Sequence, residues 1–168
     1  KIKFKEKVTG VDIMENLCQM AADYGFTVGF LGGGAKIAER ASECLKKKYS
    51  KLKVIFTKSG GKINENGEPE GGNDLDKIPP VDILLVAFGA PKQEIWISEH
   101  LDRLPVKIVI GVGGAFDYFS GRVLRAPKWV QKAGFEWLFR LILEPWRFKR
   151  QLVLFEFIFL VLRERIRT

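Results

Sequence analysis

Four short apolar runs, separated by segments with helical spacing, constrain the fold of this chain more than any other feature. The runs cover residues 26–31, 52–57, 81–88 and 106–112. Each is nearly continuous in Val, Ile, Leu and Phe, which is typical of strands buried on both faces of a parallel sheet. The pattern predicts an α/β protein: a Rossmann-like parallel sheet with helices on both faces and right-handed connections.

Helical patterns precede the first run and fill two of the intervals between the runs. They cover residues 11–24, 35–49 and 91–102, and Pro91 fits the first helical position, where its missing N–H costs nothing. The interval 58–80 differs because it is rich in Gly and Pro. We expect a long loop there in place of a crossover helix.

Glycine follows three of the four predicted strands, at the sheet edge where ligands of such folds bind. The three turns contain Gly32, Gly33 and Gly34; Gly89 with Lys92 and Gln93; and Gly111, Gly113 and Gly114. Glycine lets backbone N–H groups approach phosphate oxygens, and the N-terminus of the following helix favours an anion. Each turn taken singly is more simply a tight connection, but three at one edge indicate a diphosphate site.

A dinucleotide fits the first turn less well than a sugar nucleotide does. Ile37 stands where a dinucleotide fingerprint needs its third glycine, and Thr57 and Lys58 stand where it needs a ribose-binding acid. The sequence therefore disfavours an NAD oxidoreductase. It leaves a sugar nucleotide open and calls for no cofactor.

The metal and nucleophile signals are weak. Asp74 and Asp76 form an acidic pair of the kind used in metal-dependent sugar transfer, but within a Gly/Pro-rich loop such residues are more often turn formers. Cys18 and Cys44 lie in predicted helices without metal-ligand spacing, and His100, near a helix end, is expected at the surface. We predict no metal and a reducing compartment.

The positive charge of the chain belongs to its C-terminal part. The whole chain carries a net charge of +8, and residues 122–168 hold eleven basic and four acidic residues. The same segment holds nine of the twenty aromatic residues. Positive charge and aromatic side chains in the same segment indicate an anionic partner. Arg122 and Arg125 follow the last glycine turn closely enough to reach a diphosphate, or they form surface ion pairs.

Within this segment, apolar residues recur at helical spacing from Val130 to Ile142, with Lys128, Lys132 and Arg140 on the other side. Residues 152–162 are apolar except for Glu156, yet eleven helical residues span only about 16 Å. That length is too short to cross a bilayer, so the helix either lies in the membrane interface or packs against protein. Because basic residues are not interleaved there, lipid is favoured over nucleic acid.

Four motifs resemble the WecG/TagA/CpsF family of bacterial glycosyltransferases, in order and over essentially the whole chain. They are GAPKQE at 89–94, GVGGAFD at 111–117, GRVLRAP at 121–127 and EWLFRLILEPWRFKRQ at 136–151. The resemblance implies inverting, metal-independent transfer of N-acetylmannosamine, or its uronic acid, from a UDP-sugar to a polyprenyl-diphosphate-linked N-acetylglucosamine acceptor. The expected location is cytoplasmic, peripheral on the inner face of the cell membrane, in the synthesis of teichoic acid or surface polysaccharide.

The same resemblance assigns roles to residues. It places Gln93 in the active site, and it assigns Arg140, Arg147 and Arg150 to the donor diphosphate or the lipid acceptor. Asp117 is expected to be structural, hydrogen-bonding the glycine turn.

Three departures from the family pattern matter for activity. The family carries a longer N-terminal portion with a catalytic aspartate, so this chain alone is expected to be inactive. Lys7 stands where the family has an arginine, which keeps the charge but loses the bidentate fork. The loop 58–80 replaces the usual wall of the pocket.

The prediction therefore has two parts. Residues 1–126 form a nucleotide-sugar-binding core, with Gly32, Gly33, Gly34, Gly89, Lys92, Gly113, Gly114, Lys7, Arg122 and Arg125 as substrate-binding candidates. Residues 127–168 form a C-terminal helical membrane-association appendage that meets an anionic membrane surface and leaves self-association into a homo-oligomer open. The alternative is a non-catalytic module that binds a nucleotide or nucleic acid.

Overall fold

The computed structural model describes residues 8–61, 63–64, 70, 77–145, 148, 160–161 and 163–164. The chain divides into two compact units, Lys1–Val123 and Leu124–Thr168. Each unit is described by itself.

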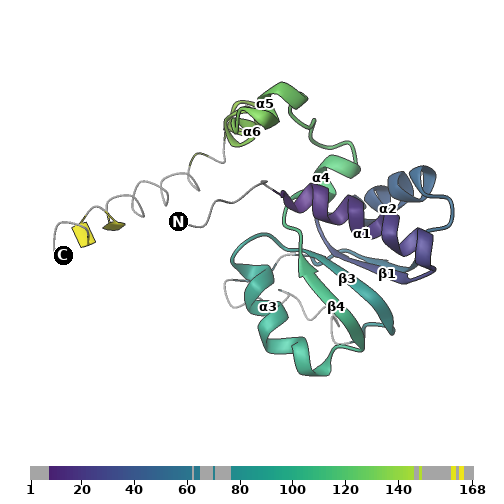
Figure 1. Cartoon of the computed structure of the whole chain (residues 1–168). Helices are drawn as coiled ribbons and strands as arrows, with labels where there is room; N and C mark the ends of the chain where they lie inside the picture. Colours follow the sequence, from purple (N-terminus) through teal and green to yellow (C-terminus); the bar gives the residue numbers. More distant parts are fainter. Residues whose placement is uncertain are drawn as a thin grey trace. The chain divides into compact units, whose positions relative to one another are not determined.

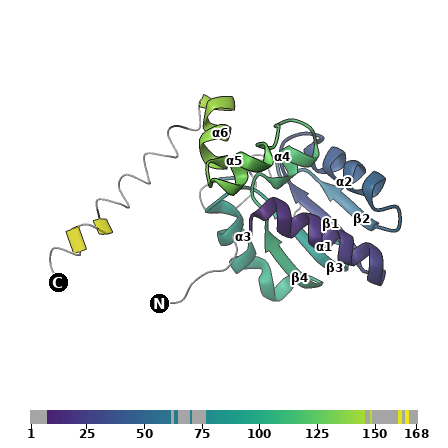
Figure 2. The ribbon, with the colours of Figure 1, turned by 45° about the horizontal axis from the view of Figure 1, so that its top comes forward.

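The first unit contains a four-stranded sheet in which every strand is parallel to its neighbours. The strands are β1 (Thr27–Gly32), β2 (Lys53–Lys58), β3 (Val81–Ala87) and β4 (Val106–Gly111), in the order β2-β1-β3-β4 (Figures 1 and 2). All four apolar runs form the predicted strands, and their boundaries differ by at most one residue. The prediction of an α/β protein with a parallel sheet is confirmed.

Helices occupy the predicted intervals. They are α1 (Gly10–Tyr24), α2 (Ile37–Lys48), α3 (Lys92–His100) with a 3₁₀ turn at Leu101–Arg103, and the short α4 (Ala115–Phe119). Thr9 and Asp12 form a capping box at the start of α1, each side chain accepting from the other residue's backbone N–H. Gly25, in the left-handed region with φ 77°, ends that helix.

Two apolar clusters cover the two faces of the sheet. One joins α1, α2 and α4 to alternate residues of β1 and β3, such as Phe30 and Leu85. The other joins Trp96 of α3 to the intervening residues, such as Leu31 and Leu84. The near-continuous apolar strands are explained by this arrangement, because both faces of the central strands are buried.

Cys18 lies in the first cluster and is fully buried. Burial, helped by the nearby charge of Glu15, raises the pKa of its thiol to about 12. The thiol is therefore protonated at neutral pH and chemically inert. Cys44, on α2, is exposed and free.

The connection from β2 to β3 contains no helix in its described part. Ile63 and Ile78, from the two ends of this connection, are buried in the cluster that α3 covers. The predicted loop is thus confirmed in the part of the connection that the structure describes.

His100 corrects one prediction, because it is buried and not at the surface. Its ring stacks on Trp96 with centroids 4.7 Å apart, and its Nδ1 lies 2.9 Å from the Trp96 carbonyl oxygen. The residues around it in sequence are polar, but its position in the last turn of α3 turns the ring back onto the preceding turn. This histidine is part of the packing.

Asp82 joins three strands at the amino ends of the sheet. Its Oδ2 accepts hydrogen bonds from the backbone N–H and the hydroxyl of Thr27, both at 2.7 Å, and its Oδ1 lies 2.7 Å from Lys107 Nζ. Lys107 first, and then the Thr27 donors, hold the pKa of this carboxyl well below its usual range. A folded-state pKa below the unfolded value means that the stabilisation is present at neutral pH and is lost on acidification.

We expect the stability of the chain to fall as pH drops below about 4, the usual carboxyl range, and we expect Asp82 to contribute to this loss. Asp82→Asn should lower the urea midpoint at pH 7 and flatten its dependence on pH below neutrality. Asp102→Asn, at an exposed position outside the strands, is the control and should keep the wild-type pH profile. Identical acid profiles for all three proteins would contradict this role.

The second unit contains two short helices, α5 (Lys128–Lys132) and α6 (Glu136–Leu143). The apolar spacing predicted continuous helix from Val130 to Ile142, but Gly134, with φ 80°, interrupts it. The apolar spacing did not predict this break, because a single glycine does not disturb the apolar pattern. Most of residues 152–162 lie outside the described residues, so the predicted interfacial helix is not tested.

No residue of α6 is buried, although most of the helix is apolar. Ile142 is 69% exposed and Trp137 49%, and Trp129 on α5 is 74% exposed. None of the helices in the described parts of the chain is long and apolar enough to cross a membrane.

Candidate functional site

The candidate site lies at the carboxyl ends of β1 and β3, where the chain changes direction across the sheet. From β1 the chain continues to β2 on one side, and from β3 it continues to β4 on the other side. Ligands of open α/β sheets bind at such a switch point. The first glycine turn is hydrogen-bonded to the end of β3 at this switch point, since the N–H of Gly33 donates to the carbonyl of Ala87 at 2.9 Å.

Gly32 and Gly33 are required at this place for steric reasons. Both have positive φ, 111° and 72°. A Cβ at position 32 would lie 2.7 Å from the carbonyl carbon of Ala87, and one at position 33 would lie 2.9 Å from the side chain of Ile37. The backbone of the turn can therefore approach β3 only without side chains.

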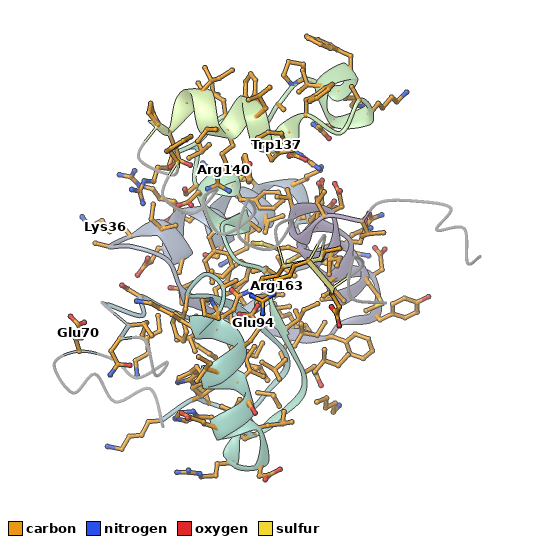
Figure 3. The ribbon with its side chains drawn as sticks, turned by 90° about the vertical axis from the view of Figure 1, so that its left-hand side faces the viewer. Lys36, Glu70, Glu94, Trp137, Arg140 and Arg163 are labelled. Carbon is orange, nitrogen blue, oxygen red and sulfur yellow. The ribbon has the colours of Figure 1, made fainter. Side chains whose placement is uncertain are left out.

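The start of α2 presents positive charge beside this turn. The helix begins after Lys36, which has a left-handed φ of 59°, and no side chain caps its N-terminus. Lys36 projects from the ribbon at this point (Figure 3). Arg122, from the segment after α4, brings its Nη1 to 3.8 Å from the position that a Cβ on Gly34 would occupy.

Asp117 lies beside this cationic group, with its Oδ1 3.6 Å from Arg122 Nη1. The carboxylate of Asp117 is mostly sheltered and the Arg122 side chain is more than half exposed. The predicted hydrogen bond from Asp117 to the glycine turn stays a prediction, and the structure adds that Asp117 lies within ion-pair distance of Arg122. Lys36 was not selected from the sequence, although its place two residues after Gly34 was a usable signal.

Gln93 bridges the second and third glycine turns. Its side chain is buried; its Oε1 accepts from the N–H of Gly113 at 2.9 Å, and its Nε2 donates to Glu94 Oε1 at 2.8 Å. A Cβ at Gly111 would lie 2.7 Å from the same amide nitrogen. Figure 3 shows Glu94 on α3 at this end of the helix. The catalytic role predicted for Gln93 stays a prediction, and its structural role is to fasten the two turns together.

Loss of this bridge should be measurable as loss of stability. Gln93→Ala leaves the N–H of Gly113 without its acceptor, so the free energy of unfolding is expected to fall by about 1–3 kcal/mol. Glu99→Ala, at an exposed position on the same helix, is the control and should change it by less than about 0.5 kcal/mol. The measurement is chemical denaturation, and equal effects of the two changes would count against the bridge.

The loop after β2 reaches the same region. Gly60 is buried, and a Cβ there would lie 2.3 Å from the ring of Phe88 and 3.4 Å from Gly32. Lys92 Nζ hydrogen-bonds to the carbonyl oxygen of Ile63. Lys92 was predicted to bind substrate, and here it holds the loop.

The remaining predicted residues fall in three groups. Gly89 and Gly113 have positive φ in their turns, and Gly114 caps α4. Arg125 belongs to the second unit, where its Nε lies 3.6 Å from Glu136 Oε1. Lys7, Arg147 and Arg150 lie outside the described residues, so their roles are not tested.

Arg140 is the one described arginine of the predicted acceptor set. Its Nε donates to Glu144 Oε2 at 2.9 Å within α6 and its C-cap, and the Arg140 side chain is only 13% exposed. Arg140 and Trp137 are both labelled on α6 in Figure 3. An arginine held by a carboxylate is oriented, but a ligand would have to compete with Glu144 for it.

The described part of the chain contains no group of three His, Cys, Asp or Glu side chains that could hold a metal ion. The acidic pair Asp74 and Asp76 lies outside the described residues. A surface hollow of about 450 Å³ is present at the opposite end of the sheet, between Thr27, Asp82 and Lys107. The side chains of those three residues already bind one another.

A parallel sheet with helices on both faces and glycine turns at its switch point defines a doubly wound α/β protein. A profile of the Glycosyl transferase WecG/TagA/CpsF family matches residues 1–168. The chain is also 30% identical over 162 residues to an N-acetylglucosaminyldiphosphoundecaprenol N-acetyl-beta-D-mannosaminyltransferase of Bacillus subtilis (strain 168). The chain belongs to the WecG/TagA/CpsF glycosyltransferase family, as its motifs predicted. The match covers 96% of this chain and 62% of the relative, so the chain spans less than two thirds of that protein's length.

Proposed function

We propose that this chain is the sugar-nucleotide-binding core and membrane-contacting part of a glycosyltransferase. The reaction is transfer of N-acetylmannosamine, or its uronic acid, from a UDP-sugar to a polyprenyl-diphosphate-linked N-acetylglucosamine. Family membership supports the reaction class, and the name of the Bacillus subtilis relative supports the sugar and the lipid diphosphate acceptor. The products of such a reaction serve teichoic acid or surface polysaccharide synthesis.

The observation that carries the donor assignment is the convergence of three features at the end of β1. The Gly32–Gly34 turn ends in the exposed Gly34, the N-terminus of α2 has no side-chain cap, and Arg122 lies beside Gly34. Backbone N–H groups, the helix dipole and a guanidinium are the donors that a diphosphate prefers. Lys36 adds a second cation at the same helix end.

In the proposed mechanism the acceptor hydroxyl attacks the anomeric carbon and the bond to UDP breaks in a single displacement that inverts the configuration. A carboxylate takes the proton of the hydroxyl, while Arg122 and the turn stabilise the charge on the departing UDP. We assign the base to residues outside this chain, which spans 62% of the relative. On this proposal the chain alone binds donor and does not turn it over.

The second unit supports a role at the membrane. Trp129, Trp137 and Ile142 expose much of their apolar surface, and Lys128 and Lys132 are exposed on the same short helix as Trp129. Exposed tryptophan next to lysine is typical of segments that lie in the interface of an anionic bilayer. We propose that α5 and α6 contact the inner face of the cell membrane, where a polyprenyl acceptor is anchored.

Calorimetric titration with UDP tests the donor site. The wild-type chain should bind UDP, and Arg122→Ala should weaken binding by about tenfold or more, since a charge-assisted hydrogen bond contributes about 1.5–3 kcal/mol. Arg103→Ala, in the exposed 3₁₀ turn, is the matched control and should bind like wild type. NAD under the same salt concentration should not bind.

Equal binding of UDP and NAD, or an unchanged affinity in Arg122→Ala, would contradict the sugar-nucleotide assignment. Tighter binding to DNA than to anionic vesicles, with no affinity for UDP, would favour the alternative of a nucleic-acid-binding module.

A further inference from the structure

The outer edge of β4 is open as far as the described residues go. Among the described residues, β4 pairs with β3 on one side and with no strand on the other. Ile108 lies in the middle of this strand and is 47% exposed, whereas its partner on β3, Ile83, is fully buried. An apolar side chain on a bare edge strand leaves both its surface and its backbone uncovered.

The backbone groups that face the open edge can be identified from the register. The N–H of Val112 donates to Val86 of β3, and side-to-side alternation along the strand then directs the amides of Ile110 and Ile108 toward β3 as well. The amides of Lys107, Val109 and Gly111 consequently face outward. These three positions are where an added strand would form its hydrogen bonds.

The connections of the sheet follow one rule of handedness. The crossover from β1 to β2 runs through α2 on the face that α1 and α4 also cover, and the crossover from β3 to β4 runs through α3 on the opposite face. The two crossovers lie on opposite faces and lead in opposite directions along the sheet. These two reversals cancel, so both crossovers have the same handedness, as parallel connections do. Figure 2 shows this strand order.

The same rule fixes the position of any strand that leads into α1. The helices α1 and α2 cover the same face of the sheet. A crossover through α1 into β1 that has the same handedness must therefore run in the same direction along the sheet as the crossover from β1 to β2. Its starting strand must then lie on the β3 and β4 side of β1. Both of those places are taken, which leaves the position beyond β4.

The start of α1 agrees with this position. A Cβ on Gly10, the first residue of α1, would lie 3.0 Å from the carbonyl oxygen of Val112, directly after β4. The helix therefore begins above the carboxyl end of β4 and not above β1, into which it leads. A strand that ended beyond β4 would be close to the start of α1.

We propose that the open edge of β4 binds a further parallel strand, formed by residues that precede α1 in the longer members of this family. The match covers 62% of the Bacillus subtilis relative, so that protein has residues outside the matched part, and the proposal assigns the strand to them. The added strand would end beside the turn of Gly111–Gly114, so residues that follow it would face Gln93 and Gly113. This inference does not depend on the proposed sugar donor or acceptor.

Amide hydrogen exchange followed by NMR tests the proposal. The samples are this chain and a form extended at its N-terminus with the preceding residues of the Bacillus subtilis relative. Exchange at Lys107, Val109 and Gly111 should slow by at least about a hundredfold in the extended form. Ile108 and Ile110, which bond to β3, serve as internal controls and should be protected in both.

Protection that appears along β2 instead would place the strand at the other edge and overturn the proposal, and so would a folded extension that changes neither edge. If the extension does not fold on this chain, the aligned strand of the full-length relative is measured with and without its N-terminal residues, and the same pattern is required. Protection of β4 in this chain alone that grows with protein concentration would assign the edge to a second copy and also overturn it.

A proline variant separates pairing from packing. Val109→Pro removes an outward amide and leaves the bonds to β3, so this chain should stay folded, while Lys107 and Gly111 lose their protection in the extended form. Val109→Ala controls for the lost side chain and should keep that protection.

Discussion

Replacing Gly32 by alanine is expected to lower the free energy of unfolding by about 3–5 kcal/mol, one of the largest effects of any single methyl group in this chain. Two causes act together. The φ of 111° is outside the regions that an L-residue adopts, and the new Cβ would lie within 2.9 Å of three backbone atoms of Ala87. Since β1 and β3 are the central strands, neither can move aside without disturbing the whole sheet.

Gly34→Ala is the matched control, because it adds the same atom to the same turn. Its Cβ would meet nothing closer than 3.7 Å, and Gly34 does not have a positive φ. We expect a change within about 1 kcal/mol. The measurement is chemical denaturation of both variants. If their free energies of unfolding differed by less than about 1 kcal/mol, the turn would be able to move away from the added methyl group, which contradicts the prediction.

Removal of the exposed apolar surface of α6 is expected to weaken binding to anionic vesicles by about a hundredfold. Trp137→Ser and Ile142→Ser together delete two side chains that are 49% and 69% exposed in the second unit. Each would contribute about 1–2 kcal/mol on transfer into the interface, and 1.4 kcal/mol is a tenfold change in affinity. Vesicle sedimentation across a range of lipid concentrations measures the effect.

The first unit offers a control of similar composition. Tyr24→Ser and Ile55→Ser also remove one aromatic and one isoleucine side chain from exposed positions. This pair should leave vesicle binding unchanged. The apolar face of α6 could instead bind a second copy of the chain, and analytical ultracentrifugation of the same proteins tests this alternative. An assembly that dissociates in the α6 variant, with vesicle binding intact, would assign the face to a second copy.

The strands were predictable because the residue types within each short run show that the run is buried. A run such as Ile83–Val86 is apolar at every position, which only a strand covered on both faces requires. The end of α1 was predictable for the same local reason, since Gly25 directly follows the helical pattern at 11–24 and ends the helix. The membership in a glycosyltransferase family followed from motifs that occur in order along the chain.

The sequence misled where a residue's surroundings come from distant segments. His100 has polar neighbours along the chain, yet its ring is covered because α3 turns it onto Trp96. The sequence also did not show that Lys92, a substrate-binding candidate, and Gln93, a catalytic candidate, hydrogen-bond to segments far away in sequence, at Ile63 and Gly113. The roles predicted for these two residues stay predictions. Lys36 went unselected because its importance comes from the left-handed start of α2 and not from a motif.

The sequence by itself thus determined the class of fold, the elements and the edge of the sheet where the glycine turns gather, since periodicity, capping and turn chemistry act over a few residues. Only the tertiary structure decided which of those turns touch, and that Arg122 joins the first turn while Gln93 joins the other two. It also decided that no described strand pairs with the outer edge of β4. The physical reason is that strand order and crossover direction depend on packing between segments tens of residues apart, and no local pattern carries that information.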